Sequence, residues 1–257
     1  MNRPAWHLEK HSARLRVGRW EAVVHLAEPH RGLTDWRAGP GSVLEARVLG
    51  LEIPGLGSHP LQSPPDCYCR GAALSASYPE WGDRPVRVDA SWRALPAAAG
   101  ASEAAAAIDL VVSVRTELLE SQPRLTVYSR LPAGEVFRLA DAVRGRFERL
   151  GPAEGPATAA ATAGGGPASC WLFRPPGDEI SYAEMVHPAD FQGSALGFDA
   201  EKGRAVEVRH QLFVEHLEKG VILRASVRGA LLPRHGDAAL AASVYAAFAS
   251  ADPPLGS

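Results

Sequence analysis

The sequence predicts an all-β protein, mainly antiparallel, built as a β-sandwich or supersandwich with one short C-terminal helix. Apolar and polar residues alternate along many segments, which is typical of strands with one buried face. Turn-forming sequences such as GPG, PAGE and EKG separate these segments. Helical periodicity is convincing in one stretch, near the end of the chain. We therefore expect antiparallel sheets packed face to face.

The alternation is cleanest in the segment RPVRVDASWRA. Val88, Ala90 and Trp92 point to one side of an extended chain, whereas Arg87 and Asp89 point to the other. The same reasoning predicts about ten strands. In chain order they are 20–27, 42–50, 73–78, 84–94, 108–118, 124–130, 169–174, 179–186, 205–217 and 219–233.

The one expected helix lies in GDAALAASVYAAFASADPP. Asp237 is the expected N-cap, because its carboxylate can accept from the first free backbone N–H groups. Leu240, Val244 and Phe248 then recur at helical spacing, and Pro253 ends the helix.

Two segments, 95–107 and 151–169, consist largely of Ala, Gly and Pro. They contain too few large apolar groups to offset the entropy lost on ordering, so we expect flexible surface insertions. A short Ala-rich helix is an alternative for the first. The flanking segments share one character, so residues 1–257 are expected to form a single β-sandwich domain.

Charge and composition exclude several classes of partner. The 257 residues carry a formal net charge of -2, which gives no electrostatic reason to bind nucleic acid or an anionic membrane. No apolar run is long enough to span a bilayer, and the N-terminus has no signal-peptide pattern, so a cytoplasmic location is expected. No phosphate-cradling glycine loop is present, and we expect no cofactor.

The three cysteines are Cys67, Cys69 and Cys170. An odd number in a chain without a signal peptide argues against a disulfide framework. Cys67 and Cys69 lack a second Cys pair with which to bind a metal, so buried small residues are the simpler interpretation.

The densest group of functional side chains is SYAEMVHPADF. His187 and Asp190 are the predicted catalytic pair, because an imidazole near a carboxylate can give and take a proton. Tyr182 and Glu184 are predicted ligand-binding residues. Since Glu184 is three residues from His187, we expect it to be a separate cleft or surface group. In the structural alternative, His187 and Asp190 only hydrogen-bond the turn that Pro188 imposes.

A second group, RHQLFVEHLEKG, contains two histidines and several carboxylates. On one strand His210 and His216 would share a face, but six residues span roughly 20 Å, too far for one ion. We therefore expect no metal site. His210 remains a candidate ligand-binding residue.

The remaining candidates are aromatic and basic. Trp81, in the turn PEWGD, is expected to be exposed, whereas Trp92 alternates with apolar residues and is expected in the core. A sugar stacks its C–H face on an aromatic ring, and its hydroxyls bind groups such as arginine. This chemistry makes Trp81, Arg87, Arg70 and Arg224 candidate ligand-binding residues.

Two segments carry a resemblance to a known family, EKGVILRASVRGALLPR with the helix after it, and RVGRWEAVVHLAEPHRGL. Together with the number and order of the strands, they resemble the galactose mutarotase-like supersandwich proteins. The chain also resembles bacterial proteins of similar length that have no assigned activity. The resemblance implies a sugar-binding or sugar-modifying protein, of the epimerase or mutarotase kind. Mutarotases use a histidine and a carboxylate on neighbouring strands, and no residue here matches a family motif for either.

The alternative hypothesis is a non-catalytic structural or protein-interaction domain, because no sharp catalytic motif is present. The two hypotheses differ in one structural expectation. A carbohydrate protein should bring its candidate residues to one surface, and a scattered arrangement favours the alternative. The residues to compare are Arg87, Tyr182, Glu184, His187, His210 and Arg224.

Overall fold

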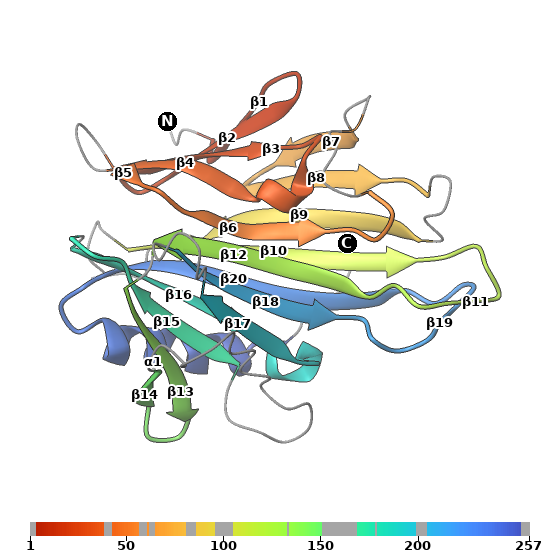
Figure 1. Ribbon diagram of the computed structural model, residues 1–257. Coiled ribbons are helices and arrows are strands. Elements are labelled where there is room, and N and C mark those ends of the chain that lie inside the picture. The colour runs from red at the N-terminus through yellow and green to blue at the C-terminus, as the bar shows by residue number, and fades with distance from the viewer. Residues whose placement is uncertain are drawn as a thin grey trace.

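The computed structural model describes residues 4–38, 43–56, 61, 65–80, 86–95, 105–132, 134–150, 169–177, 179–198 and 205–252 (Figure 1). These residues contain twenty strands, two short 3-10 helices and one α-helix, where the sequence predicted about ten strands. Two nine-stranded sheets account for nearly all the strands. The expected all-β architecture with one C-terminal helix is confirmed.

Sheet 1 is formed mainly by the N-terminal strands, and its order is β1-β2-β3-β4-β6-β12-β18-β17, with β5 paired to β4. The 3-10 helix η1 (Pro29–Arg31) lies between β3 and β4 in the chain. The strands of sheet 1 are β1 (Trp6–Leu8), β2 (Ser12–Val17), β3 (Trp20–His25), β4 (Leu33–Ala38), β5 (Val43–Leu44), β6 (Arg47–Glu52), β12 (Leu125–Pro132), β17 (Ser194–Phe198) and β18 (Ala205–Leu212).

Sheet 2 has the order β14-β13-β15-β16-β20-β10-β9-β8-β7, and β11 (Glu120–Ser121) pairs with β19 (Leu217–Glu218) as a separate ribbon. The 3-10 helix η2 (Pro188–Asp190) follows β16. The strands of sheet 2 are β7 (Asp66–Arg70), β8 (Ala73–Tyr78), β9 (Arg87–Leu95), β10 (Ala106–Arg115), β13 (Glu135–Asp141), β14 (Arg146–Leu150), β15 (Cys170–Arg174), β16 (Ile180–Val186) and β20 (Leu223–Pro233).

The main core lies between the two sheets and is built by period-two alternation. Buried and half-buried residues alternate along β9 and β10, so one face of each strand contributes to the core. Trp92 is fully buried, as the sequence predicted. Trp20 and Trp36 meet edge to face, with ring centroids 6.3 Å apart and planes at 75°.

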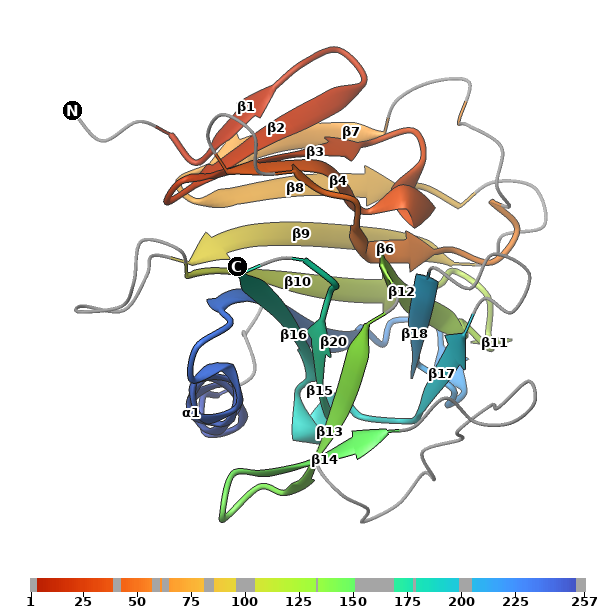
Figure 2. The same ribbon diagram turned by 60° about the vertical axis from the view of Figure 1, so that its left-hand side comes forward.

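A second, smaller core lies on the outer face of sheet 2, under helix α1 (Asp237–Ala249). Figure 2 shows the helix on that side of the molecule, away from β17 and β18. Tyr245 and Phe248 of the helix pack against Leu172, Met185 and Leu232 of β15, β16 and β20. Strand β16 lies between the main core on one face and this smaller core on the other, so all of its residues are buried.

The N-cap of α1 is Gly236, in the left-handed conformation, and Asp237 is the first helical residue, so the expected cap was wrong. The Asp237 carboxylate instead accepts hydrogen bonds from Arg174 at 2.8 and 2.7 Å and from Ser181 at 2.5 Å. A buried carboxylate requires strong donors, and these come from sheet 2. Asp237 therefore connects the helix to the sheet.

Several local expectations differ from the structure. Strand β18 ends at Leu212, and Phe213 adopts a positive φ of 56°, so His216 does not continue the face that carries His210. Cys69 is exposed and Cys67 is half-buried on β7, so the interpretation as buried small residues was wrong for this pair. All three cysteines are free thiols. The expected insertions fall mostly on 96–104 and 151–168, outside the described residues.

Candidate functional site

A fully polar cluster lies inside the sandwich, between sheet 1 and sheet 2. We call it the inner network, and its members are Ser129, Tyr182, Glu184, Ser194 and His210. Tyr182 and Glu184 lie two residues apart on β16 of sheet 2, whereas the other three project from β12, β17 and β18 of sheet 1. All five are buried.

Glu184 is the centre of the inner network. Its Oε2 accepts hydrogen bonds from the hydroxyls of Ser129 and Tyr182, both at 2.5 Å. Its Oε1 lies 3.0 Å from Nε2 of His210, whose Nδ1 is 2.6 Å from the hydroxyl of Ser194. One carboxylate thus binds donors from both sheets, and the network links the two layers.

The inner network is satisfied and closed. Burial, followed by the charge of Glu184, raises the pKa of Tyr182 well above its usual value, so this phenol stays protonated. Ser129 also accepts a hydrogen bond from the backbone N–H of Leu49 at 2.9 Å. Glu184 and His210 have no exposed surface, so a substrate has no access to them in this conformation. The arrangement is that of a structural connection between the sheets.

A second polar cluster lies on the opposite side of the same strands, facing away from the core. We call it the outer cluster, and its members are Glu52, Tyr128, Arg130, Glu207 and Arg209. Tyr128 and Arg130 alternate with buried residues on β12, and Glu207 and Arg209 do so on β18. The strand register places Tyr128 beside Arg209 and Arg130 beside Glu207.

The side chains of the outer cluster contact one another closely. The guanidinium carbon of Arg209 lies 4.5 Å from the ring centroid of Tyr128, and Nη1 of Arg209 contacts both carboxylate oxygens of Glu52 at 2.7 and 2.6 Å. Glu207 accepts from Arg130 at 2.8 Å and from the Tyr128 hydroxyl at 2.9 Å. Burial and then Glu207 raise the pKa of Tyr128, so the phenol remains a hydrogen-bond donor.

The outer cluster has different surroundings on its two sides, at β6 and at β17. Gly50 of β6 pairs with Tyr128, and a Cβ on Gly50 would lie only 2.3 Å from the carbonyl oxygen of His30, so η1 rests directly on the strand. On the other side, Gly197 of β17 pairs with Glu207, and no described residue lies within 4 Å of a Cβ position on it. Within the described part of the chain, the cluster therefore has the η1 backbone against one side and open space over β17 on the other. None of its residues was predicted as a site residue, although polar residues alternate visibly in RLTVYSR and AVEVRHQL.

Three of the sequence-predicted residues come together in the inner network, namely Tyr182, Glu184 and His210. The expectation that Glu184 is a cleft or surface group was wrong, because its side chain is completely buried. A carboxylate on the inward-facing side of a central strand must find donors inside, and His210 lies directly across the core.

His187 and Asp190 lie at η2, next to the C-terminal helix. Nε2 of His187 is 3.2 Å from the carbonyl oxygen of Ala251, and its Nδ1 accepts from the N–H of Ala189 at 3.3 Å. Asp190 accepts from the backbone N–H of Ser226 at 2.9 Å. Burial raises the pKa of Asp190, against the opposing effects of that hydrogen bond and of His187. These contacts are those of the structural alternative, and proton transfer by the pair stays a prediction.

The predicted arginines lie elsewhere. Arg87 is 3.5 Å from Asp89 on β9, and Arg224 of β20 donates to the hydroxyl of Ser113 at 3.0 Å. The register aligns Asp89, Ser113 and Arg224 across sheet 2. Arg70 is exposed on β7, and Trp81 lies outside the described residues. The predicted residues that the structure describes therefore do not gather on one surface, and for these residues the arrangement favours the alternative of a non-catalytic domain.

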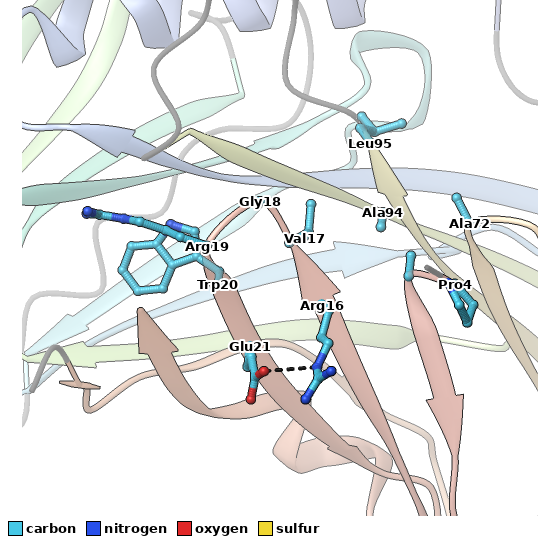
Figure 3. A pocket seen from close by; sticks show the side chains of 11 residues that line it. Pro4, Arg16, Val17, Gly18, Arg19, Trp20, Glu21, Ala72, Ala94 and Leu95 are labelled. Carbon is cyan, nitrogen blue, oxygen red and sulfur yellow. Dashed lines mark ion pairs between the residues drawn. The ribbon is translucent and has the colours of Figure 1, made fainter. Parts of the chain in front are cut away.

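A cavity of about 720 Å³ opens at the turn between β2 and β3, close to the end of β9 (Figure 3). Its polar groups are already engaged. Arg16 is paired with Glu21 at 2.9 Å, and the guanidinium of Arg19 lies 5.5 Å from the ring centroid of Trp20. Among the described residues, its lining includes three charged side chains, Arg16, Arg19 and Glu21, so it offers fewer hydrogen-bonding groups to a sugar than the five of the outer cluster.

The described part of the chain contains no group of three or more His, Cys, Asp or Glu residues that could hold a metal ion. Within the same residues, no helix is both long enough and apolar enough to cross a membrane.

The comparisons with known proteins show the fold. No protein-family model matches the chain, and no curated protein matches it. A proposed aldose 1-epimerase from Escherichia coli is similar over 86% of this chain and 98% of its own, with a TM-score of 0.56 and 12% identity. A proposed aldose 1-epimerase from Klebsiella pneumoniae is similar over 97% and 87%, with a TM-score of 0.54 and 9% identity. A galactose mutarotase-like protein from Lactobacillus casei is similar over 85% and 99%, with a TM-score of 0.51 and 12% identity.

Proposed function

We propose that this protein binds a carbohydrate on the outer face of sheet 1, at the outer cluster. The observation that carries the proposal is the half-exposed group of Tyr128, Arg209, Glu207 and their partners beside the η1 backbone. The galactose mutarotase-like fold is consistent with this proposal, since proteins of that fold include proposed aldose epimerases.

The chemistry of the outer cluster suits a sugar. A pyranose offers an apolar C–H face and a ring of hydroxyls, each of which can donate and accept a hydrogen bond. Tyr128 provides an aromatic edge, Arg130 and Arg209 provide donors, and Glu52 and Glu207 provide acceptors. The partners already hold one another in place, so little side-chain entropy is lost when a ligand binds.

None of the described residues fills the space over Gly197, which gives the ligand room. The Arg209 side chain is 42% exposed, so its guanidinium can contact a ligand above β18 while it keeps its bond to Glu52. The η1 backbone closes the opposite side, which favours an approach from β17. A partly exposed polar surface with the η1 backbone on one side suits the end of a glycan or a single sugar ring.

A glycan and monosaccharide binding screen on the purified protein tests the proposal, with affinities measured by calorimetry. We expect Arg209→Ala to weaken the binding of the best ligand at least tenfold, which is about 1.4 kcal/mol. The matched control is Arg87→Ala, because Arg87 is a similarly exposed arginine (39%) with a carboxylate partner on sheet 2. The affinity of Arg87→Ala for the same ligand should stay within about twofold of the wild-type affinity.

Two outcomes would contradict the proposal. A loss of affinity in Arg87→Ala with none in Arg209→Ala would move the site to sheet 2. A screen with no sugar ligand would favour the alternative of a non-catalytic interaction domain.

The same ligand also tests the predicted catalytic pair. The best ligand should also be assayed for chemical modification by the wild-type protein. Any activity found should then be measured in His187→Ala and in the outer-cluster variants. A variant that keeps its activity and binding but loses stability would make His187 a structural turn residue. Loss of activity with affinity and stability intact would instead support proton transfer by His187.

A further inference from the structure

The edge strand β7 (Asp66–Arg70) exposes an aromatic side chain and lacks the residues that usually protect a sheet edge. It is the last strand of sheet 2, and among the described residues it pairs only with β8, while β1 of sheet 1 lies close to it without pairing. Its central side chain, Tyr68, is 61% exposed. The strand has neither proline nor lysine, the residues that commonly keep sheet edges from pairing with another chain.

The backbone geometry of the β7–β8 hairpin shows which groups face outward. The two-residue turn Gly71–Ala72 joins Arg70 to Ala73, and a tight turn closes with a hydrogen bond between its flanking residues. Bonded and non-bonded pairs then alternate along an antiparallel ladder. Cys67 and Cys69 therefore direct their N–H and C=O groups away from β8, toward the edge of the sheet.

The sequence of β7, DCYCR, is complementary to itself in an antiparallel arrangement. A two-fold axis at Tyr68 brings Asp66 opposite Arg70 of a second copy, and Arg70 opposite Asp66. It also brings Cys67 opposite Cys69 and Tyr68 opposite Tyr68. We propose that two copies of this chain pair through β7 in this register, forming a homodimer with one sheet continuous across both.

The charges of β7 distinguish it from the opposite edge of sheet 2. On β14, Arg146 pairs with Glu148 and Arg149 pairs with Glu135 of β13, both at 3.3 Å. Within the described residues, Asp66 and Arg70 have no ion-pair partner of their own. The dimer supplies two such pairs, related by the two-fold axis, and both lie on the same face as Tyr68.

The backbone also gains partners. Each Cys67–Cys69 pair across the axis is a bonded pair, and its two residues exchange both N–H···O bonds. Opposite Cα atoms in such a pair are about 5.5 Å apart, a separation at which a disulfide can form. The thiols are therefore a direct reporter of the register.

Charge reversal tests the pairing. Sedimentation velocity of the full chain, over about a hundredfold range of concentration, should show a reversible dimer. Asp66→Arg alone and Arg70→Asp alone should each weaken the dimer at least tenfold, because each places like charges opposite one another. The double variant, Asp66→Arg with Arg70→Asp, should restore the wild-type dissociation constant. A wild-type monomer throughout the range, or a double variant as weak as the singles, would overturn the proposal.

Cross-linking tests the register independently. Diamide accepts two hydrogens and is reduced to its hydrazine, while two thiols lose them and form one disulfide. Wild type should give a covalent dimer on non-reducing gels. Cys67→Ser alone and Cys69→Ser alone should each give little covalent dimer, because the remaining thiol of one copy then lies opposite a serine of the other. An equal mixture of the two variants should regain the covalent dimer, at least about tenfold above either variant, because Cys69 of one meets Cys67 of the other. Equal cross-linking in the separate variants would refute this register.

Discussion

The strands β12 and β18 carry two polar clusters, one on each face. On the inner face, Ser129 and His210 join the inner network around Glu184. One residue away on the outer face, Tyr128 and Arg209 join the outer cluster. Both clusters combine a carboxylate with a cationic or polar partner at hydrogen-bond distance. They differ in their access to solvent, which is complete burial on one side and partial exposure on the other.

That difference separates a structural role from a binding role. A buried carboxylate that loses its donors remains in a medium of low polarity, so its contacts are indispensable to the fold. A half-exposed pair that loses a partner is rehydrated, and its contacts contribute little to stability. The outer cluster is thus able to exchange partners with a ligand, whereas the inner network is not.

The largest expected effect belongs to the inner network. Glu184→Ala leaves the hydroxyls of Ser129 and Tyr182 and the ring of His210 without their common acceptor. We expect a loss of about 3–5 kcal/mol in the free energy of unfolding, measured by urea denaturation followed by circular dichroism.

The matched control is Glu207→Ala, which removes the same side chain from the outer face. Its expected loss is below about 1 kcal/mol. Equal losses of unfolding free energy in Glu184→Ala and Glu207→Ala would show that burial does not make the inner network more important to stability than the outer cluster. Glu184→Gln keeps one carbonyl acceptor and should lie between them.

An intermediate effect is expected at Asp237, which is buried although its partner Arg174 reaches the surface. Burial alone would raise the pKa of Asp237, but hydrogen bonds from Arg174 and Ser181 and the positive charge of Arg174 hold it below the ordinary value near 3.8. The unfolded chain therefore takes up a proton first as the pH falls. The contribution to stability is complete above that ordinary value and is lost as the pH falls through the lowered folded value.

Urea denaturation of wild type and Asp237→Asn at about pH 7 and about pH 3 measures this contribution. We expect the variant to be less stable by about 1.5–3 kcal/mol at neutral pH, the usual contribution of hydrogen bonds to a charged group. The difference should become smaller at the acidic pH. A difference that is the same at both pH values would mean that the charge of Asp237 contributes nothing.

The smallest expected effect is the coupling between Arg209 and Glu52. A double-mutant cycle with Arg209→Ala and Glu52→Ala should give a coupling energy of about 0–1 kcal/mol, because both side chains are well exposed. Addition of salt should reduce it further. A coupling above about 2 kcal/mol would place the outer cluster in the same energetic class as the inner network.

Much of the fold was predictable from local patterns. The strand expected at 73–78 is β8 (Ala73–Tyr78) to the residue, and the expected core position of Trp92 is confirmed. Several strands were missed, among them β2 (Ser12–Val17), whose alternation is clear, and others whose alternation is weak. The strand β14 (Arg146–Leu150) has no buried residue, and β13 (Glu135–Asp141) is interrupted by a bulge. Their place in the sheet comes from pairing with neighbours, which a period-two pattern does not report.

Local sequence patterns were enough to predict the fold class and the apolar face of each regular strand, because side-chain direction alternates residue by residue. They assign His210 to the side of Val208, and Arg209 to the other. The partners of these two residues are visible only in the folded protein. Glu184 is 26 residues from His210 and lies on the opposite sheet, and Glu52 is 157 residues from Arg209. Such pairs depend on strand order and register, which are set by packing of the whole sandwich and leave no local pattern in the chain.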